Sequence, residues 1–244
     1  MYDAFSRMEA LVGTRGVKCL GSAKIAVFGI GGVGSYVVEA LARCGVGSLT
    51  LVDHGNLSRT DINRQLYALE SAVGCKKVKA AKEHIKDIDE NILVHTYETY
   101  YSKETADMFD LKAYDYIVDT MDADNAKLFL IEQARLCGIP VITCLTTENK
   151  LNPSRLEIAD ISRVSGDSFA KTIRAELKKK NVRKVKVLYS REKTIAGKDK
   201  KSKNPEAVQL NGSISFVQGT AGMLIAGEVV RDLLAKKNPE SKRK

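Results

Sequence analysis

The sequence lacks the features that mark membrane, secreted and disulfide-rich proteins. None of its apolar runs approaches the ~20 residues that a membrane-spanning helix requires. The first residues carry acids early and show no basic-then-apolar layout, which argues against a secretory signal. The 244 residues include five cysteines, an odd number at wide spacing and without a C-x-x-C pair. This pattern argues against a disulfide framework and a zinc ribbon. We therefore expect a reducing, cytoplasmic compartment and no membrane.

Acidic charge is scarce only in the second part of the chain. Residues 1–150 hold 17 Lys and Arg against 20 Asp and Glu, whereas residues 151–244 hold 22 against 10. We expect a near-neutral core over residues 1–150 and a basic part over residues 151–244, packed on the same domain. Such asymmetry often marks a polyanion-binding part.

Positive charge is densest at residues 171–203, where 14 Lys and Arg stand against 3 Asp and Glu. A cluster of this kind gives sequence-independent affinity for RNA phosphates, and Phe169 and Tyr189 are nearby candidates for stacking on bases. A merely solvated lysine surface would have the same composition.

Short apolar runs alternate with amphipathic segments through the first part of the chain. This rhythm predicts a doubly wound α/β fold with a mainly parallel, Rossmann-like sheet covered on both faces. Ligands of such folds bind at the carboxyl ends of the strands. The predicted strands are 24–30, 49–53, 92–97, 114–119 and 141–144, and the predicted helices are 34–44, 76–88 and 122–137.

The alternation of apolar runs with amphipathic segments changes after residue 150. We expect strands at 155–159, 184–189 and 213–217, a basic helix at 169–180 and a closing apolar helix at 222–235. Residues 193–205 are rich in Lys, Gly and Asn, and they predict a mobile loop.

A glycine loop, GIGGVG, follows the first predicted strand and opens a helix. Gly29, Gly31 and Gly34 supply the G-x-G-x-x-G spacing, and Gly32 adds a fourth glycine. Backbone N–H groups at such a helix N-terminus attract phosphate. Asp53 ends the second strand, where an acid accepts hydrogen bonds from ribose hydroxyls. The loop predicts nucleotide binding but does not distinguish NAD from ATP.

Two cations and two acids distinguish these nucleotides. Arg64, within Asn63–Gln65, and Lys77 can converge on one phosphate site, which suits a triphosphate attacked at its α-phosphorus. Asp119 and Asp122 end the fourth strand, and paired carboxylates there suit Mg²⁺. These residues therefore favour ATP and Mg²⁺. The structural alternatives are a surface ion pair for Arg64 and a helix N-cap for Asp122.

Taken together, these motifs resemble the adenylating enzymes of the ubiquitin-activating and ThiF-like superfamily. Within that superfamily the sequence is most similar to the tRNA threonylcarbamoyladenosine dehydratases. The resemblance covers nearly the whole chain in order. Its most specific segments are FSRMEALVG (5–13), DINRQ (61–65), NKLNPSRLEIADI (149–161), ELKKKNVRKVKVLYS (176–190) and GSISFV (212–217).

The resemblance implies ATP-dependent dehydration of N6-threonylcarbamoyladenosine in tRNA. ATP adenylates the free carboxylate with release of pyrophosphate, and an intramolecular attack then closes a ring and expels AMP. The implied site comprises Gly31, Gly32 and Gly34 at the phosphates, Asp53 at the ribose, Arg64 and Lys77 at the polyphosphate, and Asp122 at Mg²⁺. The other candidates for cofactor binding are Gly29, Asn63, Gln65 and Asp119. The resemblance also implies a homodimer in which Arg7 reaches the ATP of the partner subunit.

Three short segments depart from the pattern of this family. Leu145–Glu148 stands where a glycine-rich segment is expected, and larger side chains with an acid there predict a narrower substrate pocket. Residues 167–169 (Asp-Ser-Phe) replace a segment that tends to carry a cysteine. Residues 218–220 (Gln-Gly-Thr) replace a turn that usually contains proline.

Other functions compete with this interpretation. An activator of a ubiquitin-like sulfur-carrier protein shares the adenylating core but usually has C-x-x-C zinc pairs or a mobile catalytic thiol. Cys144 is the best candidate for a functional thiol, although a structural role is favoured. If the protein has a sulfur-relay partner, the sequence does not identify it. A non-catalytic RNA-binding protein would bind tRNA without nucleotide turnover. A nicotinamide dehydrogenase would leave Arg64 and Lys77 unexplained.

Overall fold

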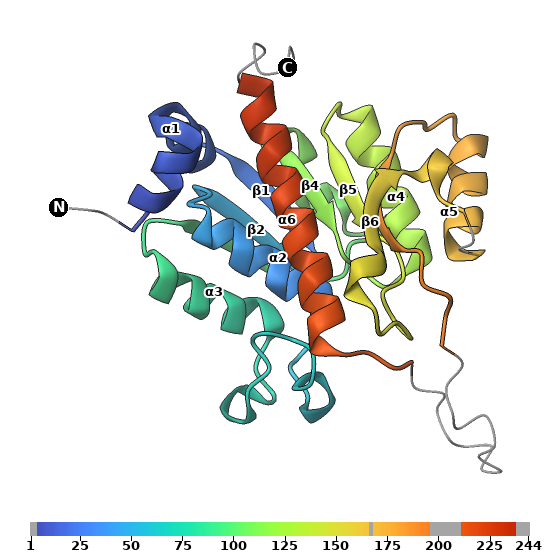
Figure 1. Ribbon diagram of the computed structural model, residues 1–244, viewed down its shortest axis with the longest axis horizontal. Coiled ribbons are helices and arrows are strands. Elements are labelled where there is room, and N and C mark those ends of the chain that lie inside the picture. Colours follow the sequence, from blue (N-terminus) through green and yellow to red (C-terminus); the bar gives the residue numbers. More distant parts are fainter. Residues whose placement is uncertain (1–3, 166–167, 196–210, 238–244) are drawn as a thin grey trace.

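The computed structural model describes residues 4–165, 168–195 and 211–237, and Figure 1 shows a central sheet with helices on both sides. The strands are β1 (Lys24–Phe28), β2 (Ser48–Val52), β3 (Leu93–Tyr97), β4 (Tyr116–Asp119), β5 (Val141–Cys144), β6 (Leu156–Asp160) and β7 (Lys186–Ser190). The helices are α1 (Ser6–Gly21), α2 (Gly32–Arg43), α3 (Lys77–Ile88), α4 (Asp124–Leu136), α5 (Ser168–Lys179) and α6 (Ser215–Lys237). Among the helices in these described ranges, none combines the length and the apolar composition of a membrane span.

The sheet has the order β3-β2-β1-β4-β5-β7-β6. Neighbouring strands are parallel from β3 to β7, and β6 runs antiparallel to β7. The chain starts in the middle of the sheet, moves out to β3 and returns past β1 to β4. This confirms the predicted doubly wound, mainly parallel fold, and it places a switch in strand order between β1 and β4.

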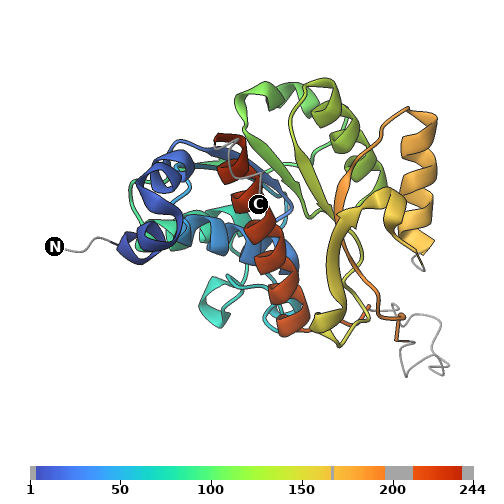
Figure 2. The same ribbon diagram turned by 45° about the horizontal axis from the view of Figure 1, so that its top comes forward.

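Both faces of the sheet are covered, which explains why the inner strands are apolar throughout. In β1, Ile25 and Val27 pack into the core beneath α2, α3 and α6, whereas Ala26 and Phe28 face the core beneath α4. Side chains alternate between the faces of a strand, so each face needs its own apolar set. Figure 2 shows α6 and α2 on one side of the sheet, and α4 and α5 on the other.

Helix α6 corrects one prediction. The strand predicted at 213–217 is wrong, because α6 already begins at Ser215. Val217, Ala221, Ile225 and Val229 are at most 1% exposed and recur every four residues, which is the spacing of one helix face. The short apolar run at 213–217 fits both the two-residue period of a strand and the period of a helix, and its packing on α2 selects the helix. Gly222 permits this packing, because a Cβ there would lie 2.6 Å from Cβ of Tyr36.

The basic second part continues the same sheet through β7 and β6. Helix α5 packs against α4 through a separate apolar cluster that includes Ile131 and Ile173. The domain boundary placed at residue 150 stays a prediction. Residues 196–205 of the predicted mobile loop lie outside the described residues.

Candidate active site

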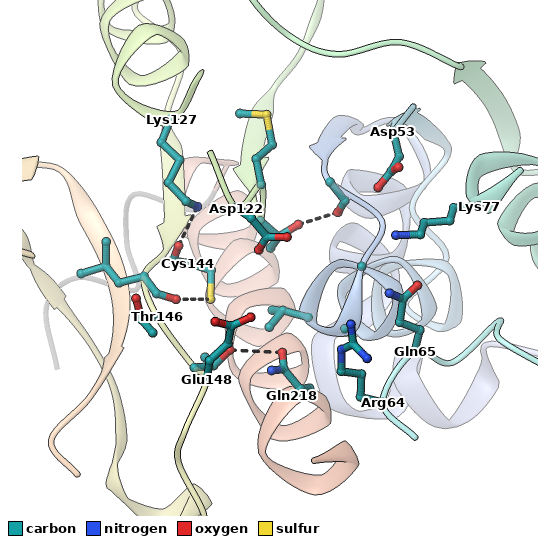
Figure 3. A pocket seen from close by; sticks show the side chains of 18 of the residues that line it. Asp53, Arg64, Gln65, Lys77, Asp122, Lys127, Cys144, Thr146, Glu148 and Gln218 are labelled. Carbon is teal, nitrogen blue, oxygen red and sulfur yellow. Dashed lines mark hydrogen bonds between the residues drawn. The ribbon is translucent and has the colours of Figure 1, made fainter. Parts of the chain in front are cut away.

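A cavity of about 500 Å³ opens at the carboxyl ends of β1, β2, β4 and β5. This is the sheet edge at which the sequence predicted a ligand site. Its lining comes from the glycine loop, the segments after β2 and β4, the start of α3, and the loop after β5. Figure 3 shows Arg64 and Lys77 on one side of the cavity, with Asp122 and Glu148 nearer the other.

Some residues of the glycine loop line the cavity, and one allows the tight turn of the loop itself. Gly29, Gly31 and Gly32 line the cavity, and α2 begins at Gly32 with its free backbone N–H groups toward it. Gly34 does not line the cavity. A Cβ at Gly34 would lie 1.9 Å from the carbonyl oxygen of Gly29, so no larger residue fits there without moving the loop. Gly34 therefore allows the close turn rather than contacting a ligand.

Asp53 holds two loops at the cavity. Its Oδ2 accepts a hydrogen bond from the backbone N–H of Ile30 at 2.7 Å, and its Oδ1 accepts one from that of Gly55 at 2.7 Å. Each carboxylate oxygen has more than one lone pair, so acceptor capacity remains for a hydroxyl in the cavity. The side chain fixes the glycine loop and is also available to a ribose.

Arg64 lines the cavity and is held by Asp61, a residue that the sequence reasoning missed. Nη2 of Arg64 lies 3.2 Å from Oδ1 of Asp61, and Nε2 of Gln65 donates to the same oxygen at 2.8 Å. Asp61 is 6% exposed. Its spacing of three and four residues before Arg64 and Gln65 was the available signal, because a helical turn brings such residues together.

Lys77 approaches from the start of α3. A Cβ built at Gly55 would lie 3.4 Å from Nζ of Lys77 and 3.1 Å from Oδ1 of Asp53, which shows how closely the two side chains meet at this turn. Lys77 and Arg64 both line the same cavity. Two cations from separate segments therefore face one space, as a polyphosphate requires.

The two acids after β4 have different surroundings. Asp122 is exposed and lines the cavity, and the N-cap of α4 is Ala123 rather than Asp122. Asp119 is fully buried beneath the cavity and is not among its lining residues. Burial raises the pKa of the Asp119 carboxyl, while the Lys127 ammonium and the backbone N–H of Met121 act against that rise.

Lys127 is the second site residue that the sequence reasoning missed. It is 3% exposed, and its Nζ lies 3.4 Å from each carboxylate oxygen of Asp119. It also donates a hydrogen bond to the carbonyl oxygen of Cys144 at 2.8 Å. The available signal was its place beside Ala126 and Leu130 on the apolar face of a predicted helix, where an unpaired lysine is rare.

The loop after β5 forms the wall opposite the cations. Leu145–Glu148, Phe169 and Gln218 all line it, so the three segments that depart from the family pattern meet on one side of the cavity. Oγ1 of Thr147 donates to Oε1 of Gln218 at 3.1 Å, and both side chains are buried. Whether these side chains make the pocket narrower than a glycine-rich segment would stays a prediction.

Three candidate residues lie away from the cavity. Arg7 is exposed on α1, and Asn63 is exposed and donates to the carbonyl oxygen of Ser213 at 2.9 Å. Tyr189 is 4% exposed, and its hydroxyl donates to Glu157. The prediction that Tyr189 stacks on a base is therefore wrong, because β7 buries its ring in the core around α5.

Cys144 lines the cavity as a buried thiol. Burial raises its pKa to about 12, and its S–H donates to the carbonyl oxygen of Leu145. A thiol with so high a pKa is a poor nucleophile at neutral pH. This supports the structural role that was favoured for Cys144.

The chain is similar to known proteins over almost its full length. The sequence profile of the ThiF family matches residues 5–244. A tRNA threonylcarbamoyladenosine dehydratase of Bacillus subtilis (strain 168) is 38% identical over 244 residues, which cover 96% of each chain. The crystal structure of E. coli tRNA N6-threonylcarbamoyladenosine dehydratase in complex with ATP superposes with a TM-score of 0.87 at 26% identity, covering 97% of this chain and 96% of that one.

A relative with a different activity matches less of the chain. The adenylyltransferase and sulfurtransferase MOCS3 of Dictyostelium discoideum is 31% identical over 132 residues, which cover 54% of this chain and 31% of that protein. The similarity to dehydratases extends through the basic second part, whereas this match covers little more than half of the chain.

Proposed function

The chain belongs to the ThiF family, and we propose that it dehydrates N6-threonylcarbamoyladenosine in tRNA with consumption of ATP. One observation carries the proposal. Arg64 and Lys77 reach, from separate segments, the cavity that the glycine loop and Asp122 also line. A carboxylate is unreactive toward an internal nucleophile, and transfer of AMP onto it makes its carbonyl carbon reactive.

The first step is adenylation. The substrate carboxylate attacks the α-phosphorus of ATP, a carboxyl oxygen–phosphorus bond forms, and the bond to pyrophosphate breaks with its electron pair. Negative charge grows on the phosphates, so fixed cations lower the barrier. Arg64, held by Asp61, and Lys77 supply these cations, while Gly31 and Gly32 leave the backbone N–H groups of α2 open to the phosphates.

Asp53 and Asp122 hold the two ends of the nucleotide in this proposal. The carboxylate of Asp53 accepts a hydrogen bond from a ribose hydroxyl. Asp122 holds Mg²⁺, which in proteins commonly takes one or two carboxylates together with phosphate and water oxygens. The exposed carboxylate of Asp122 fits that donor set, and the described residues contain no group of three or more His, Cys, Asp and Glu side chains that could hold a metal ion. When bound, Mg²⁺ neutralises phosphate charge.

The basic second part is the tRNA-binding part in this proposal. Six basic side chains border a second cavity between β6, α5 and the start of β7: Arg163, Arg174, Lys178, Arg183, Lys184 and Lys186. Neutralisation of phosphates by such side chains favours RNA binding and makes it sensitive to salt. Phe169, which lines the ATP-side cavity, is the aromatic candidate for stacking on the modified base.

We also propose a homodimer that places Arg7 at the partner's nucleotide. Helix α6 exposes Phe216 (47%), Met223 (47%) and Leu224 (36%), and a second copy of the chain would cover these apolar side chains. Arg7 is exposed on α1 and has no place at the cavity of its own chain, which is consistent with a role across an interface.

Activation of a sulfur-carrier protein is not favoured. The thiol that lines the cavity, Cys144, is buried and has a raised pKa. The sequence has no C-x-x-C pair for a zinc ribbon. Neither feature suits sulfur or thioester transfer.

The direct test is the mass of the modified nucleoside. The protein is incubated with ATP, Mg²⁺ and tRNA that carries N6-threonylcarbamoyladenosine, and the tRNA is then digested. The proposal predicts a nucleoside lighter by one water and an equal amount of AMP. Unchanged nucleoside mass with a folded, ATP-binding protein would exclude the activity.

A further inference from the structure

Glu148 is a carboxylate without an assigned task in the wall of the cavity that the loop after β5 forms. It is half-buried in the loop after β5, lines the cavity and lies across from Arg64 in Figure 3. Within the described residues, no hydrogen bond or ion pair engages its side chain. From the sequence, Glu148 is expected only to narrow the pocket.

The residues on both sides of Glu148 are held by hydrogen bonds to the last part of the chain. Before it, Thr147 donates to the buried side chain of Gln218 on α6. After it, the backbone N–H of Asn149 donates to the carbonyl oxygen of Gly212, and Oδ1 of Asn149 accepts from the N–H of Gly212, both at 2.7 Å. The loop therefore holds Glu148 in place, while its carboxylate stays free to meet a ligand.

Other carboxylates at this edge already have partners. Asp53 accepts two backbone hydrogen bonds, Asp61 holds Arg64 and Gln65, and Asp119 is buried against Lys127. Asp122 and Asp124 remain, but both follow β4, and Asp122 is the residue proposed to hold Mg²⁺. Glu148 is the available acceptor on the wall from which the substrate carboxylate must approach.

Ring closure requires such an acceptor. Whichever atom of the carbamoyl group attacks the activated carbonyl carbon, one bond to that carbon forms and its bond to the AMP oxygen breaks. AMP leaves with the electron pair, and the ring becomes neutral only when one N–H proton of the carbamoyl group departs. A positioned carboxylate commonly accelerates such a proton transfer by ~100-fold or more.

We propose that Glu148 accepts the carbamoyl N–H proton during ring closure. The inference rests on the proposed function, because it assigns the second half of that reaction. Before closure the carboxylate accepts a hydrogen bond from the N–H and so orients the carbamoyl group. After closure it passes the proton to water through the open side of the cavity.

The test separates the two halves of the reaction. E148Q keeps the size of the side chain but cannot accept the proton, and E83Q on α3 is the matched control at an exposed ion pair. Each variant is mixed with ATP labelled at the α-phosphate and with tRNA that carries threonylcarbamoyladenosine. Pyrophosphate release reports adenylation, label on the tRNA reports the acyl-adenylate, and AMP release with nucleoside mass reports ring closure.

We expect E148Q to release about one pyrophosphate per site at the wild-type rate and to accumulate labelled tRNA. Ring closure should slow by about 100-fold, whereas E83Q should match the wild type. E148D should recover part of the rate, because it restores a carboxylate. Wild-type ring closure in E148Q would overturn the proposal. So would a loss of pyrophosphate release in E148Q, because Glu148 would then serve adenylation. Failure of the wild-type protein to release pyrophosphate would overturn the proposed function itself.

Discussion

The ammonium of Lys127 and the carbonyl oxygen of Cys144 form a buried hydrogen bond of 2.8 Å at the floor of the cavity. Lys127 comes from α4, Cys144 ends β5, and the same ammonium also faces Asp119 at the end of β4. One side chain thus fixes the relative positions of two strand ends. The loops that carry Asp122 and Glu148 start from these strands, so the geometry of the site depends on this contact.

Replacement of Lys127 should destabilise the protein strongly. K127M leaves the buried Asp119 carboxyl without its cation, and breaking a buried pair in this way costs about 3–5 kcal/mol. Urea unfolding measures the loss. The double variant K127M/D119N should recover part of it, because the amide carries no charge. A cost below about 1 kcal/mol for K127M would contradict the buried ion pair.

Loss of either cation proposed to bind the phosphates, Arg64 or Lys77, should stop the chemistry without unfolding the protein. R64A and K77A should each lower pyrophosphate release by at least about 100-fold, because a fixed charge at the transition state is removed. R59A and K79A are matched controls, since both side chains form exposed ion pairs in the same segments. Full activity in R64A and K77A would show that the site is assigned wrongly.

Two glycines of the loop should respond differently to alanine. G34A forces a Cβ to within 1.9 Å of the carbonyl oxygen of Gly29, so stability should fall by about 1–3 kcal/mol. A Cβ at Gly31 meets no heavy atom within 4 Å, so G31A should fold normally but bind ATP more weakly. Thermal unfolding and ATP titration of the two variants separate these effects. Equal stability of G34A and wild type would be inconsistent with the close turn.

The contact between β7 and α6 should weaken in acid. Lys186 donates to Oε1 of Glu228 and Oδ2 of Asp232, both at 2.6 Å. Partial burial raises the pKa of Glu228, whereas hydrogen bonds from Lys186 and Arg231 lower it. The hydrogen bonds and the charges of these two cations together outweigh burial, so the net pKa shift is downward. A folded pKa below the unfolded value of about 4.3 means that the stabilisation is present above that value. It is lost as the pH falls through the folded pKa.

The variant E228Q isolates this contribution. At pH 7 it should cost about 0.5–1 kcal/mol, the range of a partly exposed ion pair. Its difference from the wild type should shrink as the pH falls below about 4. Urea unfolding at a series of pH values measures both, with E83Q as the exposed control. A difference that does not change with pH would contradict the pKa shift of Glu228.

The sequence predicted the parts of the fold that local patterns determine. The apolar strands and amphipathic helices of the core could be recognised in the sequence. Both faces of the sheet are covered, so the strands are apolar throughout and do not alternate between apolar and polar residues. The region 213–217 was mispredicted, since a run of five residues fits either the strand or the helix period, and only its packing on α2 selects a helix. Likewise, the exposure of Tyr189 depends on which face of β7 meets α5, and that was not visible in the sequence.

Site residues could be predicted where a motif carries them and not where distant segments meet. The glycine loop, Asp53, Arg64, Lys77 and Asp122 stand in recognisable spacings, and the structure brings them to one cavity. Lys127 was missed because its partners lie on two strands distant in sequence. The anchoring of Glu148 was missed for the same reason, because Gln218 and Gly212 come from the last part of the chain.

We propose that this chain adenylates the threonylcarbamoyl carboxylate of a tRNA. The most direct measurement is the rate of pyrophosphate release from ATP with tRNA that carries the modification and with the same tRNA lacking it. We expect strong stimulation by the modified tRNA alone, with AMP and the dehydrated nucleoside formed in equal amounts. Equal rates with both tRNAs, or release without a change in nucleoside mass, would contradict it.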